Sequence, residues 1–228
     1  MADQNTQRRE NRDPDVIHRM DGKGVILKVR QALDIDKVRF SFVSYGSDNK
    51  ATSSVDCYLS AEDFGLLMER ARNESLQKQI YKEKQRAQAE GEQYPKAIYT
   101  SPIGGGTTKH SGVVSRHFTI APGSRAEVMF TGLAFAAERS NTGAYIAKKG
   151  EKPVARISVP ATYHDLALMA YKWQWLEKDY MPKRFNMVAM KSDYNREEHE
   201  TNTPVQQQEE PSEGFTDIQD TEDDLPFA

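Results

Sequence analysis

Two nine-residue stretches decide the fold: SAEDFGLLM, from Ser60 to Met68, and TYHDLALMA, from Thr162 to Ala170. Each begins with a hydroxyl side chain suited to cap a helix, has an aspartate three residues later and continues with apolar residues at helical spacing. Each also follows a run of alternating apolar and polar residues that is typical of a strand. The sequence therefore predicts several strands followed by a helix, twice, with repeats at residues 15–90 and 95–181, although any strand that leads into a capped helix would show the same local pattern.

The clearest strand is KVRFSFVSY, residues 37–45. Its alternation predicts a core face with Val38, Phe40 and Phe42, and a second face that carries cations and an aromatic ring toward solvent. The residues of that solvent face are Lys37, Arg39, Ser41, Val43 and Tyr45.

The two helices are expected to end differently. From Asn73 the first continues as the polar stretch NESLQKQIYKEKQRAQAEGEQ, which we expect to project from the body or to fray. The second is predicted to end near Met181, because Pro182 lacks a main-chain donor and breaks a helix.

These elements predict an α+β protein with antiparallel β-sheets and two helices. If the repeat is real, the order of four strands and a helix, twice, resembles the Whirly and PUR families, which bind single-stranded nucleic acid. The resemblance is one of topology over Val16 to Met181 and includes no diagnostic motif. An OB-fold barrel with inserted helices is the alternative architecture.

Charge divides the chain into a basic body and an acidic tail. From Ala189 onward two basic residues face 12 acidic ones, a net charge of −10, which leaves +7 for residues 1–188. We predict a disordered polar arm at residues 1–14, a basic nucleic-acid-binding body at 15–188 and a disordered acidic tail at 189–228. A basic body favours a polyanionic partner.

Catalytic and metal-binding patterns are not found in the sequence. The five histidines are scattered, and the single cysteine, Cys57, excludes a disulfide framework and fits a reducing cytoplasm. The glycine-rich stretch SPIGGGTTKHSG, which begins at Ser101, lacks the spacing of a phosphate-binding loop and is interpreted as a mobile hairpin loop. No apolar run is long enough to cross a bilayer. We therefore expect a cytoplasmic protein that is not an enzyme and needs no cofactor or metal ion.

Aromatic residues beside cations are the candidate nucleic-acid site. Proteins that hold single strands combine a positive track for phosphates with rings on which bases stack. Several predicted strands and hairpins of this chain carry both types of side chain. The candidate residues are Lys28, Arg30, Lys37, Arg39, Tyr45, Tyr99, Lys109, His110, Arg116, Phe118, Arg125, Tyr145, Lys148 and Lys149.

The tail ends in DTEDDLPFA, where carboxylates precede three apolar residues. This resembles the acidic tip of bacterial and phage single-stranded DNA-binding proteins, in which a few carboxylates precede Pro-Phe and the tip docks on replication, recombination and repair enzymes. Here Ala228 follows the phenylalanine, which departs from the family pattern. The residues that the resemblance assigns to partner binding are Asp223, Asp224, Leu225, Pro226 and Phe227.

The body and the tail together suggest one function. The resemblance implies a single-stranded DNA-binding protein of a phage or mobile element in a bacterial cell, which coats and protects single strands and recruits enzymes through its tip. A second apolar stripe on the second helix, at Leu168, Tyr171 and Trp175, predicts a homo-oligomer. The alternatives are a strand-annealing recombination mediator and a DNA-mimicking inhibitor.

Overall fold

The computed structural model describes residues 15–108, 112–141, 143–148 and 150–201, with side chains except at 107, 108 and 187–201. Contacts divide the chain into Met1–Lys183 and Arg184–Ala228. All strands and the helices that cover them belong to the first unit, and the second contains the end of helix α3 (Tyr163–Thr201). The predicted arm and residues 202–228 of the predicted tail lie outside the described residues.

The first sheet is a meander of four antiparallel strands, in which each strand pairs with the next along the chain. Val38, Phe40 and Phe42 are fully buried, whereas Lys37 and Arg39 on the other face are only partly covered. The predicted core face of this strand is therefore confirmed. Ser41, which was expected on the solvent face, is buried, so that part of the prediction is wrong. The strands are β1 (Val16–Gly22), β2 (Val25–Ala32), β3 (Lys37–Tyr45) and β4 (Ala51–Ser60), with a 3-10 turn, η1 (Leu33–Ile35), between β2 and β3.

The second sheet has the order β10-β8-β7-β5, with β6 also paired to β7 and β9 to β8. All its pairs are antiparallel. Its strands are β5 (Tyr99–Thr100), β6 (Gly104–Thr108), β7 (Gly112–Pro122), β8 (Val128–Arg139), β9 (Tyr145–Ala147) and β10 (Ala155–Ala161).

The glycine-rich stretch is a strand over part of its length, so its interpretation as a loop is wrong for β6. The backbone of β6 pairs with β7 from Gly104 to Thr108. A Cβ atom at Gly105 would collide with the ring of Tyr145, and one at Gly106 would collide with the guanidinium of Arg116. These two strand positions are glycine because neighbouring side chains lie flat across the backbone.

The described residues form three α-helices where two were expected: α1 (Ala61–Arg72), α2 (Ser75–Ala89) and α3. The polar continuation of the first helix forms α2, with Leu76 and Ile80 fully buried, so it neither projects nor frays. Glu74, at a positive φ of 62°, separates α1 from α2. A narrow apolar stripe is enough to anchor a helix that is otherwise polar.

The predicted helix starts are confirmed, whereas the predicted end of the second helix is wrong. Ser60 Oγ accepts a hydrogen bond from the Asp63 amide at 3.0 Å, and Thr162 Oγ1 accepts one from the Asp165 amide at 3.1 Å. Helix α3 continues through Pro182 to Thr201 and thus includes residues 189–201 of the predicted disordered tail. A proline removes one hydrogen bond of a helix, and the residues beyond it can resume helical geometry.

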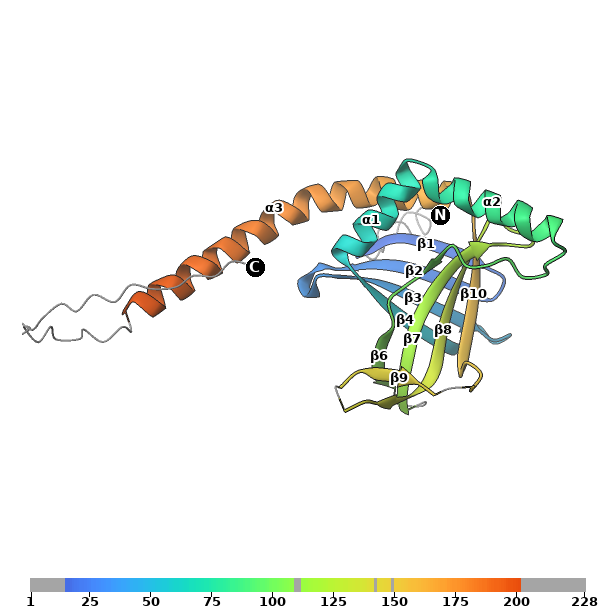
Figure 1. Cartoon of the computed structure of the whole chain (residues 1–228), viewed down its shortest axis with the longest axis horizontal. Coiled ribbons are helices and arrows are strands. Elements are labelled where there is room, and N and C mark those ends of the chain that lie inside the picture. The colour runs from blue at the N-terminus through green and yellow to red at the C-terminus, as the bar shows by residue number, and fades with distance from the viewer. Residues whose placement is uncertain (1–14, 109–111, 142, 149, 202–228) are drawn as a thin grey trace, which may run out of the picture. The chain divides into compact units, whose positions relative to one another are not determined.

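The two sheets and the helices share one core. Phe40 of the first sheet stacks on Phe118 of the second with 4.2 Å between ring centroids, and Phe64 of α1 meets Trp173 of α3 edge-on at 4.9 Å. Figure 1 shows the strands of the two sheets crossing, with α2 beside one end of β7, β8 and β10. Four consecutive strands lead into α1, and the path β5-β7-β8-β10 leads into α3. The predicted α+β fold with a repeated unit of four strands and a helix is confirmed.

Candidate nucleic-acid interface

The register of the first sheet gathers cations on the face that points away from the core. Arg19 of β1 lies opposite Lys28 of β2, and Arg30 of β2 lies opposite Arg39 of β3. Arg39 in turn lies opposite Tyr58 of β4. We call this surface the basic face; its residues are Arg19, Lys28, Arg30, Lys37, Arg39 and Tyr58.

The basic face has more positive than negative charge. Described carboxylates on this face include Asp21, which accepts hydrogen bonds from Arg19 at 2.8–3.0 Å, and Asp56, which accepts two from Arg39 at 2.8 and 3.1 Å. The hydrogen bond to Asp56 raises the pKa of Arg39 against the opposing effect of burial. Like charges opposite each other on a sheet are unfavourable for folding. The placement of Arg30 opposite Arg39 therefore suggests a surface suited to an anionic ligand.

An exposed ring adjoins these cations. The Tyr58 side chain is 40 % exposed and stands beside Arg39 on the neighbouring strand. Ile26 and Val43, paired on β2 and β3, are half-buried on the same face. Cations for phosphates and a ring for a base are the two elements that hold a single strand.

A cleft of about 630 Å³ opens between β4 and the second sheet; we call it the edge cleft. Its residues from β4 include Ser53, Ser54 and Asp56, and those opposite include Arg116 of β7 and Ala155 of β10. Because Asp56 lines the cleft and is hydrogen-bonded to Arg39, the cleft adjoins the basic face.

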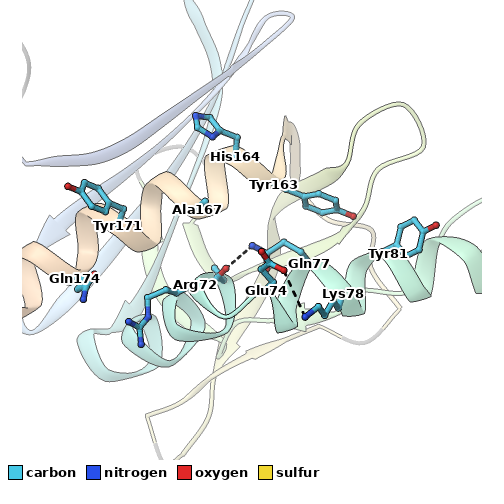
Figure 2. Close-up of a pocket in the computed structure, with 11 residues that line it drawn as sticks. Arg72, Glu74, Gln77, Lys78, Tyr81, Tyr163, His164, Ala167, Tyr171 and Gln174 are labelled. Atoms are coloured by element: carbon cyan, nitrogen blue, oxygen red, sulfur yellow. Dashed lines mark hydrogen bonds and ion pairs between the residues drawn. The ribbon is translucent and has the colours of Figure 1, made fainter.

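A second hollow, of about 600 Å³, lies between the helices and is lined by residues of α2 and α3 and the end of α1. Figure 2 shows Tyr163 of α3 pointing toward Tyr81 of α2, and Arg72 and Lys78 on the opposite wall from α3. Burial raises the pKa of Tyr163. The two cations pair with Glu69 and Glu74, so this hollow has little surplus charge.

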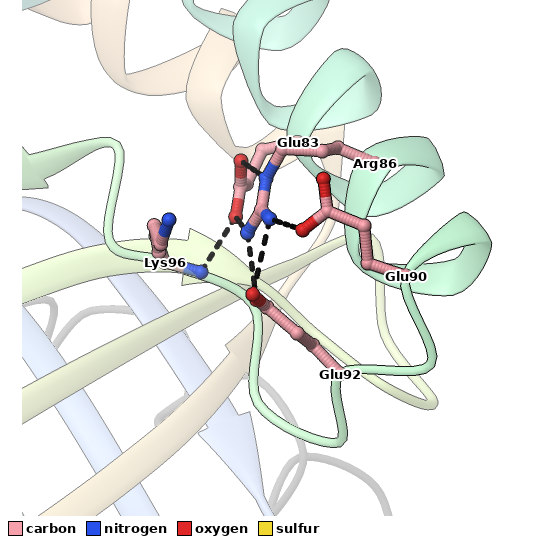
Figure 3. Close-up of polar contacts among 5 residues, drawn as sticks. All are labelled: Glu83, Arg86, Glu90, Glu92 and Lys96. Atoms are coloured by element: carbon pink, nitrogen blue, oxygen red, sulfur yellow. Dashed lines mark hydrogen bonds and ion pairs between the residues drawn. The ribbon is translucent and has the colours of Figure 1, made fainter.

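One dense polar cluster is structural. Arg86 of α2 donates hydrogen bonds to Glu83, Glu90 and Glu92, and Glu83 also accepts one from the main-chain amide of Lys96 at 2.7 Å (Figure 3). The bond to Arg86 is the main reason that the pKa of Glu83 falls to about 2. These hydrogen bonds attach the end of α2 to the segment before β5. The guanidinium of Arg86 is paired with three carboxylates, so the cluster offers no surplus positive charge.

The structure brings together only some of the predicted nucleic-acid residues. Lys28, Arg30, Lys37 and Arg39 lie on the basic face. Tyr45 follows a register shift at the end of β3 and is half-buried. Lys109, His110, Lys149 and the tip residues Asp223, Asp224, Leu225, Pro226 and Phe227 lie outside the described residues.

The remaining candidates are scattered over the second sheet. Phe118 is fully buried and Tyr99 packs against it with 5.8 Å between ring centroids, so the prediction of Phe118 as a stacking platform is wrong. Arg116 lines the edge cleft, Arg125 is exposed between β7 and β8, and Tyr145 lies over Gly105. Lys148 pairs with Glu138 at 3.7 Å.

Arg19 and Tyr58 were not predicted from the sequence. Both belong to strands whose alternation is visible, since Ile17, His18 and Met20 are buried around Arg19, and Cys57 and Leu59 are buried around Tyr58. The pairing register of the four β-strands places Arg19 beside Lys28 and Tyr58 beside Arg39. The sequence of one β-strand does not show how that strand is registered against its neighbours.

No described helix has the length and apolar character needed to cross a membrane, and the described part of the chain holds no group of three or more His, Cys, Asp or Glu side chains placed for a metal ion. No family model and no curated protein matches the sequence. A solved structure of the plant transcriptional regulator PBF-2 is similar, with 11% identity and a TM-score of 0.42, over 82% of this chain and 96% of that one. The function is therefore inferred from the residues of the basic face.

Proposed function

We propose that the chain is a non-enzymatic protein that binds single-stranded nucleic acid, with phosphates held on the basic face. The observation that carries the proposal is Arg30 directly opposite Arg39, with Lys28 two residues along the same strand. Three cations this close together on neighbouring strands can contact successive phosphates of a polyanion that lies across the strands.

A single strand fits the basic face better than a duplex. The bases of a single strand present open ring faces that can stack on Tyr58, whereas the bases of a duplex are already stacked on one another. The cations of this face lie in rows across neighbouring β-strands and not along a helix that could enter a major groove. Binding through phosphates releases counterions, so affinity should fall as salt rises.

The finer part of the proposal concerns DNA and the tail. Single-stranded DNA is the proposed ligand in the cell, and residues 223–227 are proposed to recruit replication, recombination or repair enzymes to it. The support is the residue pattern itself: carboxylates suited to a basic rim, followed by Leu225, Pro226 and Phe227, whose apolar side chains suit a hydrophobic pocket.

The test is a titration of a labelled oligothymidylate and a labelled duplex hairpin by fluorescence anisotropy at two salt concentrations. The native protein should prefer the single strand. Replacing Lys28 and Arg30 with glutamine should weaken binding and flatten the salt dependence by about 0.7 in log–log slope for each lost phosphate contact. Lys82→Gln, an exposed cation on α2, is the matched control and should change neither quantity. Equal affinity for the duplex, or an unchanged slope in the double variant, would refute the proposal.

A further inference from the structure

The edge cleft continues the basic face around the rim of the first sheet. β4 is the edge strand of that sheet, and it pairs with β3 alone. The Arg39 guanidinium on the basic face is hydrogen-bonded to Asp56, and Asp56 also lines the cleft. A strand of nucleic acid that leaves the basic face at Arg39 therefore meets the mouth of the cleft next.

Arg116 of β7 stands inside the cleft, which Asp56 of β4 also lines. Arg116 is half-buried, and its side chain makes no hydrogen bond or ion pair with any residue that the structure describes. Its guanidinium lies across Gly106, where any larger residue would displace it. The carboxylate on the opposite wall, Asp56, is already bonded twice to Arg39. An anion that enters the cleft thus finds an unmatched positive charge held in a defined place.

The walls of the cleft leave room for a flat group. Small side chains line the second sheet at Val114, Ala134 and Ala155, and hydroxyls at Ser53 and Ser54 line β4. The volume of about 630 Å³ is within the range of small-molecule sites. Hydroxyls and the open main-chain edge of β4 can donate to and accept from the edge of a base, and a guanidinium plane can stack on its face.

We propose that the edge cleft takes one nucleotide of the bound strand, with its phosphate on Arg116 and its base between β4 and Ala155. This rests on the proposed function, because the nucleotide arrives as part of a strand held on the basic face. The basic face then supplies contacts with phosphates, and the cleft supplies the contact with a base. An extended peptide paired to the edge of β4 is the competing occupant.

The experiment separates phosphate from base contacts. Fluorescence anisotropy compares a labelled oligothymidylate with the same oligomer built from abasic tetrahydrofuran sugars, which keeps every phosphate. Ala155→Leu, which fills the cleft, should weaken binding of the thymidylate about fivefold or more and leave the abasic strand unaffected. Arg116→Gln should weaken both strands by about tenfold, because it removes a charged hydrogen-bond partner of phosphate. Arg125→Gln, an exposed arginine outside the cleft, is the matched control and should change neither.

The other outcomes are decisive as well. If Ala155→Leu binds both strands as the native protein does, no base enters the cleft, the proposed function stands, and the edge of β4 is left for an extended peptide. If the native protein binds neither strand, this inference and the proposed function both fall. Should Ala155→Leu lower the melting temperature, Ser54→Ile fills the cleft from the exposed side of β4 and must give the same selective loss.

Discussion

His18 and Asp165, 147 positions apart in the chain, are joined by a hydrogen bond of 2.9 Å between Nε2 and Oδ1. The same aspartate accepts hydrogen bonds from the amide and the hydroxyl of Thr162, at 2.8 and 2.7 Å, where α3 begins. Burial opposes the charge of Asp165, but the bonds from His18 and Thr162 outweigh it and lower its pKa. One carboxylate thus fixes the start of α3 and attaches it to β1.

Removing that carboxylate should destabilise the fold more than removing its counterpart in α1. Asp165→Ala should lower the free energy of unfolding by about 2 kcal/mol, since it costs a cap and a partly buried hydrogen bond. Asp63→Ala is the matched control, because Asp63 occupies the same place in α1, and among the described residues its carboxylate accepts from Ser60 alone, at 2.7 Å. Urea denaturation of both variants measures the difference; equal losses would mean that the bond to His18 contributes nothing.

Acid should weaken the attachment of α2 through Glu83. The pKa of this carboxyl is about 2 in the folded chain against an ordinary value of 4.5, chiefly because Arg86 donates to it. Because the carboxyl of Glu83 binds its proton less tightly in the folded chain than in the unfolded chain, its ionised form contributes fully to the stability of the fold above pH 4.5. That contribution is lost as the pH falls from 4.5 toward 2. Thermal melts between pH 5 and 2 should therefore show a smaller acid-induced drop in melting temperature for Glu83→Gln than for the native protein. Glu138→Gln, from an exposed pair with Lys148, should follow the native curve.

The sequence predicted features that are set by neighbours along the chain. The alternation of β3 correctly placed Val38, Phe40 and Phe42 in the core, because a strand with one buried face repeats every two residues, but it missed the burial of Ser41. The two helix starts were correct for a similar reason, since a cap and its partner are three residues apart.

Features set by distant residues could not be predicted. Gly105 and Gly106 of β6 have no room for a side chain because Tyr145 and Arg116, which lie on other strands, cover them. Arg116 and Phe118 share one face of β7, yet Phe118 reaches the core against Phe40 while Arg116 lies where the sheets part at the edge cleft. Alternation shows which residues share a face, but the packing of the other sheet decides how deeply each is buried.

Helix α3 carries an exposed aromatic pair that should mediate self-association. Its inner face belongs to the core, with Leu166, Met169 and Trp173 buried. Tyr171 and Trp175 are 60% and 61% exposed and pack edge-on at 6.2 Å. Exposed aromatic patches are costly unless covered, so light scattering at micromolar concentration should find an oligomer that Trp175→Glu shifts toward the monomer. Tyr94→Glu, an exposed tyrosine in the loop before β5, should leave the mass unchanged; a native monomer would contradict the prediction.

Partner recruitment should depend on Phe227 and not on the other phenylalanine of the tail. Phe215 also has acidic neighbours, but it lacks the run of carboxylates followed by Leu-Pro-Phe. A ring that enters a hydrophobic pocket makes the largest apolar contribution available to the tip, whereas Asp223 and Asp224 act through a basic rim and govern association rate and salt sensitivity. Quantitative pull-downs from bacterial extract should therefore lose the same captured enzymes with Phe227→Ala as with deletion of residues 220–228, and keep them with Phe215→Ala. Single-strand affinity, measured by anisotropy, should be equal for Phe227→Ala and the native protein. Identical capture by all four proteins would show that the tip is not a docking segment.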